Sequence, residues 1–170
     1  MKKIFTLLTL VFLLGNFSFA QNSDEEGFVR KGKVLVETGY NIVGVYSSSS
    51  GANLIMDFDG GTISAIGADM GIMLTNSMAL KFKLGLLSGD GLSLTTISAG
   101  GKWYAGGVVP IELTAGILDN GPGSSFFTAN LRLGYAARLA ENITLEPTIG
   151  MQILEEEGVL NFGINFGLFL

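Results

Sequence analysis

The side chains of this sequence that could do chemistry are charged residues set two positions apart inside apolar segments. Residues 79 to 87 read ALKFKLGLL, which places Lys81 and Lys83 on one parity and Leu80 and Phe82 on the other. This alternation is the period of a β-strand with two unlike faces. Because ammonium groups on a buried face need carboxylate partners, the chemistry that the pattern predicts is ion pairing.

The same parity rule selects charged residues in the other alternating segments. Residues 127 to 139, FTANLRLGYAARL, oppose Arg132 and Arg138 to Leu131 and Leu133. Five bases and four acids fall on the polar faces in this way, and we expect them to form one ion-pair network inside the fold. The predicted network consists of Glu37, Asp69, Lys81, Lys83, Lys102, Glu112, Arg132, Arg138 and Glu146.

Catalysis is disfavoured by what the composition lacks. The chain has no histidine, so a conventional catalytic triad is impossible and the commonest general base is missing. It has no cysteine either, so neither a disulfide nor a thiolate nucleophile is available. No nucleotide-binding loop is present, since the glycines recur at strand periodicity. We therefore expect a protein that is not an enzyme and that carries no cofactor.

Acidic residues gather in the longer connections between the alternating segments. DFDG at 57 to 60 supplies Asp57 and Asp59, a small oxygen-ligand cluster of the kind that calcium accepts. An acidic rim of this kind would bind divalent cations or a cationic partner, whereas the plainer alternative is loops kept soluble by their charge. The residues concerned are Asp57, Asp59, Asp90, Asp119, Glu155, Glu156 and Glu157.

Eight alternating segments of about 10 to 14 residues must position these side chains. The connections after the second, fourth and sixth segments are tight, whereas those after the first, third, fifth and seventh are mostly longer and include SSSSGANLIMDFDGG and DNGPGSS. An even number of strands with short turns at one end and long loops at the other is typical of an outer-membrane barrel. The expected segments are 33–46, 62–74, 79–88, 93–105, 108–118, 126–139, 143–154 and 159–170.

The first residues predict export. Lys2 and Lys3 precede the apolar run IFTLLTLVFLL, and small Ser18 and Ala20 stand at the cleavage-site positions, so residues 1–20 read as a secretory signal peptide. We expect a short periplasmic leader at 21–31 and a barrel domain at 32–170.

The mature chain is acidic. Without Lys2 and Lys3 it has eight basic and fifteen acidic residues, and the resulting net charge of −7 disfavours binding to nucleic acid. Mean hydropathy is +0.47.

The alternation fits two kinds of barrel, which differ in which face is turned outward. A membrane barrel turns the apolar parity to lipid, whereas an exported soluble barrel of the lipocalin kind turns it inward around a small apolar ligand. The polar parity is crowded with glycine and other small residues, which suit a narrow lumen better than a solvated surface. The sequence therefore favours an all-β, eight-stranded antiparallel up-and-down transmembrane barrel.

With these features the chain resembles the small outer-membrane β-barrel family of Gram-negative bacteria, the porin-like proteins of the outer membrane protein A and X type. NFGINFGL near the end is similar to the C-terminal signal that the barrel-assembly machinery reads in that family. The resemblance implies an outer-membrane location among lipid and lipopolysaccharide. One departure is a final Leu170 in place of the family's usual outward aromatic. The implied signal residues are Asn161, Gly163, Phe166, Leu168 and Leu170.

The function expected from these observations is a structural, envelope-integrity or surface-interaction role. Eight strands enclose a lumen that side chains fill, so we expect the ion-pair network to plug it. The alternatives are a narrow low-conductance pore and the soluble lipocalin-like carrier.

Overall fold

The computed structural model describes residues 29–43, 54–58, 61–89, 92–121, 125–154 and 157–170. Within these residues the chain is all β, and no helix there is long and apolar enough to cross a membrane. The strands are β1 (Val34–Val43), β2 (Leu54–Phe58), β3 (Gly61–Met73), β4 (Met78–Gly89), β5 (Leu92–Ala105), β6 (Val109–Asp119), β7 (Ser125–Gly134), β8 (Ala137–Ala140), β9 (Ile143–Leu154) and β10 (Glu157–Phe169).

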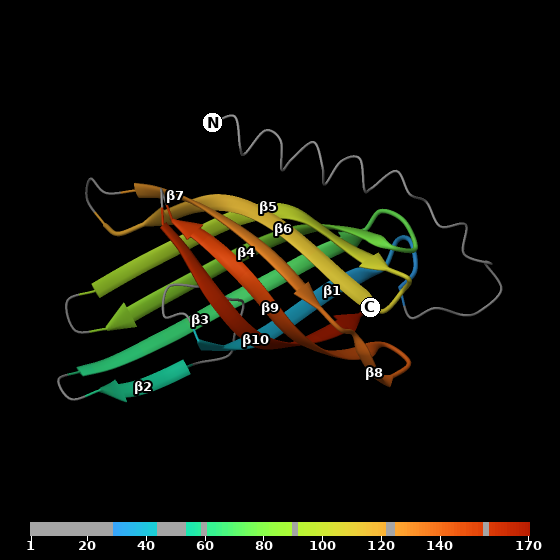
Figure 1. Cartoon of the computed structure of the whole chain (residues 1–170), viewed down its shortest axis with the longest axis horizontal. Helices are drawn as coiled ribbons and strands as arrows, with labels where there is room; N and C mark the ends of the chain where they lie inside the picture. Colours follow the sequence, from blue (N-terminus) through green and yellow to red (C-terminus); the bar gives the residue numbers. More distant parts are fainter. Residues whose placement is uncertain (1–28, 44–53, 59–60, 90–91, 122–124, 155–156) are drawn as a thin grey trace.

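The strands form one antiparallel sheet that closes on itself (Figure 1). Each barrel strand pairs with its neighbours in the chain, and β1 closes the sheet by pairing with both β10 and β3. Because β7 and β8 both pair with β9 and together make one side of the wall, the barrel has eight strands. The predicted fold class, an eight-stranded antiparallel up-and-down barrel, is confirmed.

Two features of the wall differ from the expected segments. Residues 54–58 were predicted to lie in a loop but form β2, which pairs with Gly61–Ala65 of β3. The segment expected to run through 126–139 is interrupted between β7 and β8 at Tyr135 and Ala136. Pro147 of β9 lies opposite this break, and because proline has no N–H it cannot donate a ladder hydrogen bond there. The Ala136 N–H leaves the ladder with β9 and donates to the carbonyl oxygen of Val108.

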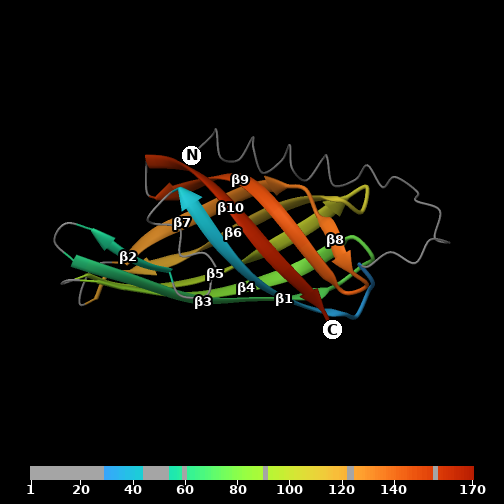
Figure 2. The same cartoon turned by 90° about the horizontal axis from the view of Figure 1, so that it is seen from below.

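The two ends of the barrel differ, and we call them the turn end and the loop end. The turn end carries the connections 74–77, 106–108 and 141–142 together with the chain's last residue. Gly106 and Gly107 both have positive φ, at 59° and 75°, which a two-glycine turn permits at no steric cost. At the loop end β2 and β3 lie side by side, away from the C-terminus, in both views (Figure 2).

Alternation along each strand separates an apolar outside from a polar inside. In β4 every even-numbered residue from Met78 to Ser88 is exposed and every odd-numbered residue from Ala79 to Leu87 is buried. Large apolar side chains cover the outside, and the most exposed of them include Ile66, Leu84, Leu86, Ile97, Ile117, Phe127, Tyr135, Leu139, Leu160 and Leu170. The apolar parity therefore faces away from the lumen, opposite to the arrangement of a lipocalin-like carrier.

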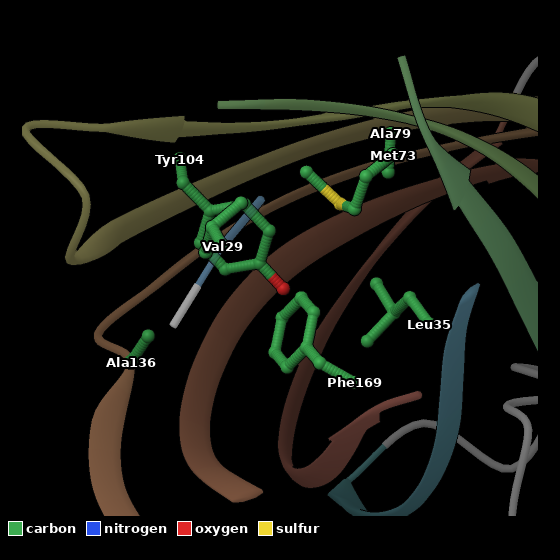
Figure 3. Packing of buried hydrophobic residues seen from close by; sticks show 7 residues of the cluster. All are labelled: Val29, Leu35, Met73, Ala79, Tyr104, Ala136 and Phe169. Atoms are coloured by element: carbon green, nitrogen blue, oxygen red, sulfur yellow. The ribbon is translucent and has the colours of Figure 1, made fainter. Parts of the chain in front are cut away.

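Apolar side chains also gather inside the barrel towards each end. At the turn end Tyr104 and Phe169 pack with their ring centroids 6.0 Å apart, and Leu35 and Met73 lie beside them (Figure 3). We call this the turn-end cluster, and it consists of Val29, Leu35, Met73, Ala79, Tyr104, Ala136 and Phe169. The loop-end cluster consists of Leu87, Leu94 and Leu118, with Phe126 and Leu154 packed against it.

The residues just before β1 are attached to the turn end. Val29 is buried in the turn-end cluster, and the Gly32 N–H donates to the Met73 carbonyl oxygen at 2.8 Å. Lys31 N–H donates to Asn76 Oδ1 at 3.0 Å. Residues 29–31, expected to belong to a leader, therefore pack against the barrel. The predicted signal peptide at 1–20 and the rest of the leader lie outside the described residues.

Candidate functional site

The candidate site is a layer of buried charge that crosses the lumen between the two apolar clusters. Its members come from seven different strands, because each strand contributes one or two inward positions at this height. We call it the charged layer. It contains the carboxylates and bases Glu37, Asp69, Lys81, Lys83, Lys102, Glu112, Arg132 and Glu146, each no more than 5% exposed.

Lys81 of β4 lies at the centre of three carboxylates. Its Nζ is bonded to Glu37 Oε2, lies 2.7 Å from Asp69 Oδ2 and lies 3.0 Å from Glu112 Oε2. The three acids come from β1, β3 and β6, so one ammonium joins three parts of the wall. The lysine side chain is fully buried, and an ammonium there is stable only because it is surrounded by carboxylates.

The other two lysines extend the layer in opposite directions. Lys83 Nζ is bonded to Glu112 Oε1 and lies 3.3 Å from Asp69 Oδ2. Lys102 Nζ is bonded to both Glu37 and Glu146 and lies 4.9 Å from the centroid of the Tyr104 ring. Every lysine of the layer therefore bridges two or more carboxylates, which makes a continuous network.

Neutral side chains also donate hydrogen bonds to the Glu146 carboxylate. The hydroxyl groups of Tyr104 and Thr144 donate to Glu146 Oε1 at 3.0 Å and 3.1 Å. Neither residue was predicted from the sequence, although both share the inward parity, Tyr104 with Lys102 and Thr144 with Glu146. That shared parity is the signal that would have found them, because a buried carboxylate needs further donors.

Arg132 of β7 lies in the same layer but, unlike the lysines, forms no ion pair with a described carboxylate. It is directly opposed to Glu112 in the β6–β7 ladder and is 2% exposed. None of its three guanidinium nitrogens has a hydrogen-bond partner among the described residues. Its side chain lies over Gly150, where an added Cβ would come within 2.7 Å of Arg132 Cγ. Arg132 therefore contributes positive charge to the layer without taking a carboxylate oxygen from a lysine.

The prediction that Arg138 joins the network is wrong. Arg138 is exposed at the turn end and donates from Nε and Nη2 to the carbonyl oxygens of Ala140 and Glu141. It keeps the inward parity, opposite Thr144, but β8 carries it beyond the height of the charged layer. Without it the layer holds four carboxylates and four bases, so its formal charges balance.

Metal binding was predicted only at Asp57 and Asp59. Asp57 belongs to β2, and its side chain and the whole of Asp59 lie outside the described residues, as do Asp90, Glu155 and Glu156. In the described part of the chain one group of carboxylates is close enough to hold an ion, with oxygens of Glu37, Asp69 and Glu112 within 4.8 Å of one another. The Lys81 ammonium lies among these oxygens and serves as their counter-cation.

The predicted assembly-signal residues lie on the two faces expected of a terminal strand. Asn161 and Gly163 of β10 are buried on the inner face, whereas Phe166 is exposed and Leu168 is half-buried. Leu170 is 62% exposed, and the aromatic beside it, Phe169, turns into the lumen.

Above the charged layer the lumen contains a small polar chamber, bounded towards the loop end by the loop-end cluster. Its cavity volume is about 10 Å³, roughly the space for the centre of one water molecule. It is lined by Lys83, Thr96, Ser98, Thr114, Thr128, Asn130 and Gln152. The residues of the charged layer beneath this chamber are almost completely buried.

The fold and its interior define a class: a small closed β-barrel with an apolar exterior and a charged lumen. The N-terminal β-barrel domain of Pseudomonas aeruginosa OprF is similar in structure, at 18% identity and a TM-score of 0.50, over 82% of this chain and 98% of that one. The Yersinia pestis outer membrane protein Ail, solved in a phospholipid nanodisc, is similar at 12% identity and a TM-score of 0.50, over 82% of this chain and all of that one.

One structure from the de novo design of transmembrane β-barrels is also similar, at 15% identity and a TM-score of 0.47, over 83% of this chain and 98% of that one. No protein-family model matches the chain, and no curated protein matches it in sequence. The chain thus has the small eight-stranded outer-membrane barrel fold that the sequence resemblance implied, similar to the barrels of OprF and Ail.

Proposed function

We propose that this protein is an outer-membrane barrel with a closed lumen and a structural, envelope-integrity or surface-interaction role. The observation that carries the closed lumen is the charged layer, in which three lysines bridge four carboxylates across the full width of the barrel. An ion entering the lumen would have to break several buried ion pairs at once, and each broken pair costs about 3 to 5 kcal/mol.

The membrane location is supported by the outer surface. Phe82, Leu84 and Leu86 of β4 are each at least half exposed, and comparable side chains cover the other strands. Apolar area on this scale is too large for a soluble monomer and matches a hydrocarbon surrounding. Trp103 and Tyr135 share the outward face near the turn end, where aromatic side chains of membrane barrels meet the interface. The similar Ail structure is that of an outer membrane protein.

The partners follow from this location. Lipid and lipopolysaccharide would contact the apolar exterior, and the barrel-assembly machinery would read the end of β10. The loop end would carry any surface interaction, and an acidic rim there would attract divalent cations or a cationic partner. The competing function is a narrow low-conductance pore through the same lumen.

Two measurements test the proposal. The protein should be recovered in the outer-membrane fraction and should migrate differently in SDS gels with and without boiling, as a detergent-resistant barrel does. Recovery in the soluble fraction without a shift would overturn the membrane location.

The purified barrel should then be added to planar lipid bilayers at matched protein and salt concentrations, with a known porin as the positive control. Wild type should give no conductance steps. Regular steps in wild type, lost after heat denaturation, would overturn the closed lumen and establish the pore.

A further inference from the structure

The strand junction between β1 and β3 is the shortest one that closes the barrel. In the described residues β1 pairs with β10 at eight positions but with β3 at only four, from Val34 opposite Ile72 to Glu37 opposite Asp69. The neighbouring β3–β4 ladder has ten pairs. Because ladder hydrogen bonds hold the wall together, we expect the barrel to open first at the β1–β3 junction.

The last pair of this short ladder joins two carboxylates. Glu37 and Asp69 are directly opposed, both point into the lumen, and they are 3% and 2% exposed. Like charges directly opposed in a ladder destabilise the pairing, and burial strengthens their repulsion because the effective dielectric constant is low. The junction would therefore be pushed apart at its inner limit unless a cation joined the two groups.

Lys81 is the residue that joins them. Its Nζ contacts both Glu37 Oε2 and Asp69 Oδ2, whereas Lys83 reaches only Asp69 of this pair and Lys102 reaches only Glu37. Lys81 is positioned by β4, and the residues opposite it on both neighbouring strands, Gly71 and Gly100, have no side chains to fill the space that its stem needs.

We propose that Lys81 is the latch of the β1–β3 junction, holding the two opposed carboxylates together and keeping this side of the barrel closed. Its other contact, with Glu112 of β6, ties the latch to the far wall. Loss of the latch separates β1 from β3 and leaves the β1–β10 ladder intact, which creates a lateral opening from the lumen towards the membrane. This inference concerns the wall and holds whether or not the lumen conducts ions.

Cysteine pairs report on the junction cleanly because the natural chain contains no cysteine. Val36→Cys with Met70→Cys places two outward thiols at directly opposed positions of β1 and β3. Val36→Cys with Leu168→Cys is the matched pair across β1 and β10. Directly opposed residues of an antiparallel pair lie within disulfide range. Oxidation of the full barrel in lipid vesicles, followed by counting free thiols after denaturation, measures how often each junction is closed.

Lys81→Met removes the charge and keeps the length of the side chain, and Lys83→Met is the control that contacts only one carboxylate of the pair. Lys81→Met should slow β1–β3 disulfide formation about tenfold, because the two opposed carboxylates then face each other without the cation that joins them. The β1–β10 disulfide, and both disulfides in Lys83→Met, should form at nearly the wild-type rate. Equal β1–β3 rates in Lys81→Met and wild type would overturn the proposal.

A second comparison keeps the proposal testable where Lys81→Met alone does not fold. Lys81→Met with Asp69→Asn removes the like-charge pair, whereas Lys81→Met with Glu112→Gln removes a carboxylate that lies outside it. The first double variant should fold and recover β1–β3 disulfide formation, and the second should not. Equal recovery by both would show that Lys81 balances charge in the layer generally and would overturn its role as a latch.

Discussion

Lys102 and Glu112 are directly opposed in the β5–β6 ladder, yet they do not form an ion pair with each other. Lys102 is bonded to Glu37 and Glu146 on other strands, and Glu112 is bonded to Lys81 and Lys83. Here the network runs across the lumen rather than along the ladder, whereas Asp69 and Lys83, directly opposed in the β3–β4 ladder, do form an ion pair. This arrangement brings distant strands into direct contact, so substitutions in the layer should affect the whole barrel.

Replacing Arg132 by alanine should destabilise the barrel. Glu112 keeps Lys81 and Lys83, so no carboxylate is left alone, but the layer loses one of four bases and gains a cavity above Gly150. We expect a loss of about 3 kcal/mol in the free energy of unfolding, measured by urea titration of the barrel in lipid vesicles. Arg138→Ala is the control, because its side chain bonds only to turn carbonyls. An unchanged midpoint for Arg132→Ala would contradict the prediction.

Two adjacent glycines of β5 should respond very differently to the same substitution. A Cβ at Gly100 would lie 2.0 Å from the Leu113 carbonyl oxygen and 2.6 Å from Thr114 Cα, which are backbone atoms that cannot move away cheaply. At Gly101 the nearest atom would be 3.8 Å away. Gly100→Ala should lower the unfolding midpoint strongly or prevent folding, and Gly101→Ala should fold normally. Similar midpoints for the two variants would show that the wall adapts at Gly100.

A charge on the outside of β4 should be costly only if lipid surrounds it. Leu84 lies in the middle of the strand and is 57% exposed, so Leu84→Arg should cost about 2 to 4 kcal/mol in lipid vesicles. Thr95→Arg is the control near the loop end, beside exposed Asp119, where the cost should fall to about 1 kcal/mol or less. Equal and small effects of the two substitutions would argue against a membrane-embedded surface at Leu84.

The last two residues should have separable roles. Phe169 packs against Tyr104 in the turn-end cluster, so Phe169→Ala should cost about 3 to 5 kcal/mol of unfolding free energy in vitro. Leu170 is exposed, so Leu170→Ala should leave in vitro stability almost unchanged and lower the yield of assembled barrel in cells if the assembly machinery reads this position. Heat-modifiable migration of the outer-membrane fraction measures the yield. Reduced in vitro stability of Leu170→Ala would assign it a packing role instead.

Alternation alone determined which side chains of the barrel face the lumen. Lys81 and Lys83 are buried and Leu84 is exposed, as their parity predicts, because the pleat of a strand is a local property that needs no knowledge of the partner strand. The same local rule placed Glu37, Asp69, Lys102, Glu112, Arg132 and Glu146 inside. It also separated tight turns from longer loops, which depends on turn residues close together in the chain.

Only the tertiary structure decided which of these charges meet. The partners of Lys81 come from three strands, and Arg138 has the right parity but lies too near the end of the wall. Height along the lumen depends on strand tilt and register around the whole barrel, which are set by long-range pairing. The bond from Ala136 N–H to Val108 at the strand break and the burial of Val29 arise in the same way, because each depends on residues distant in the sequence. The short β2 is different, because it forms a local hairpin with the start of β3.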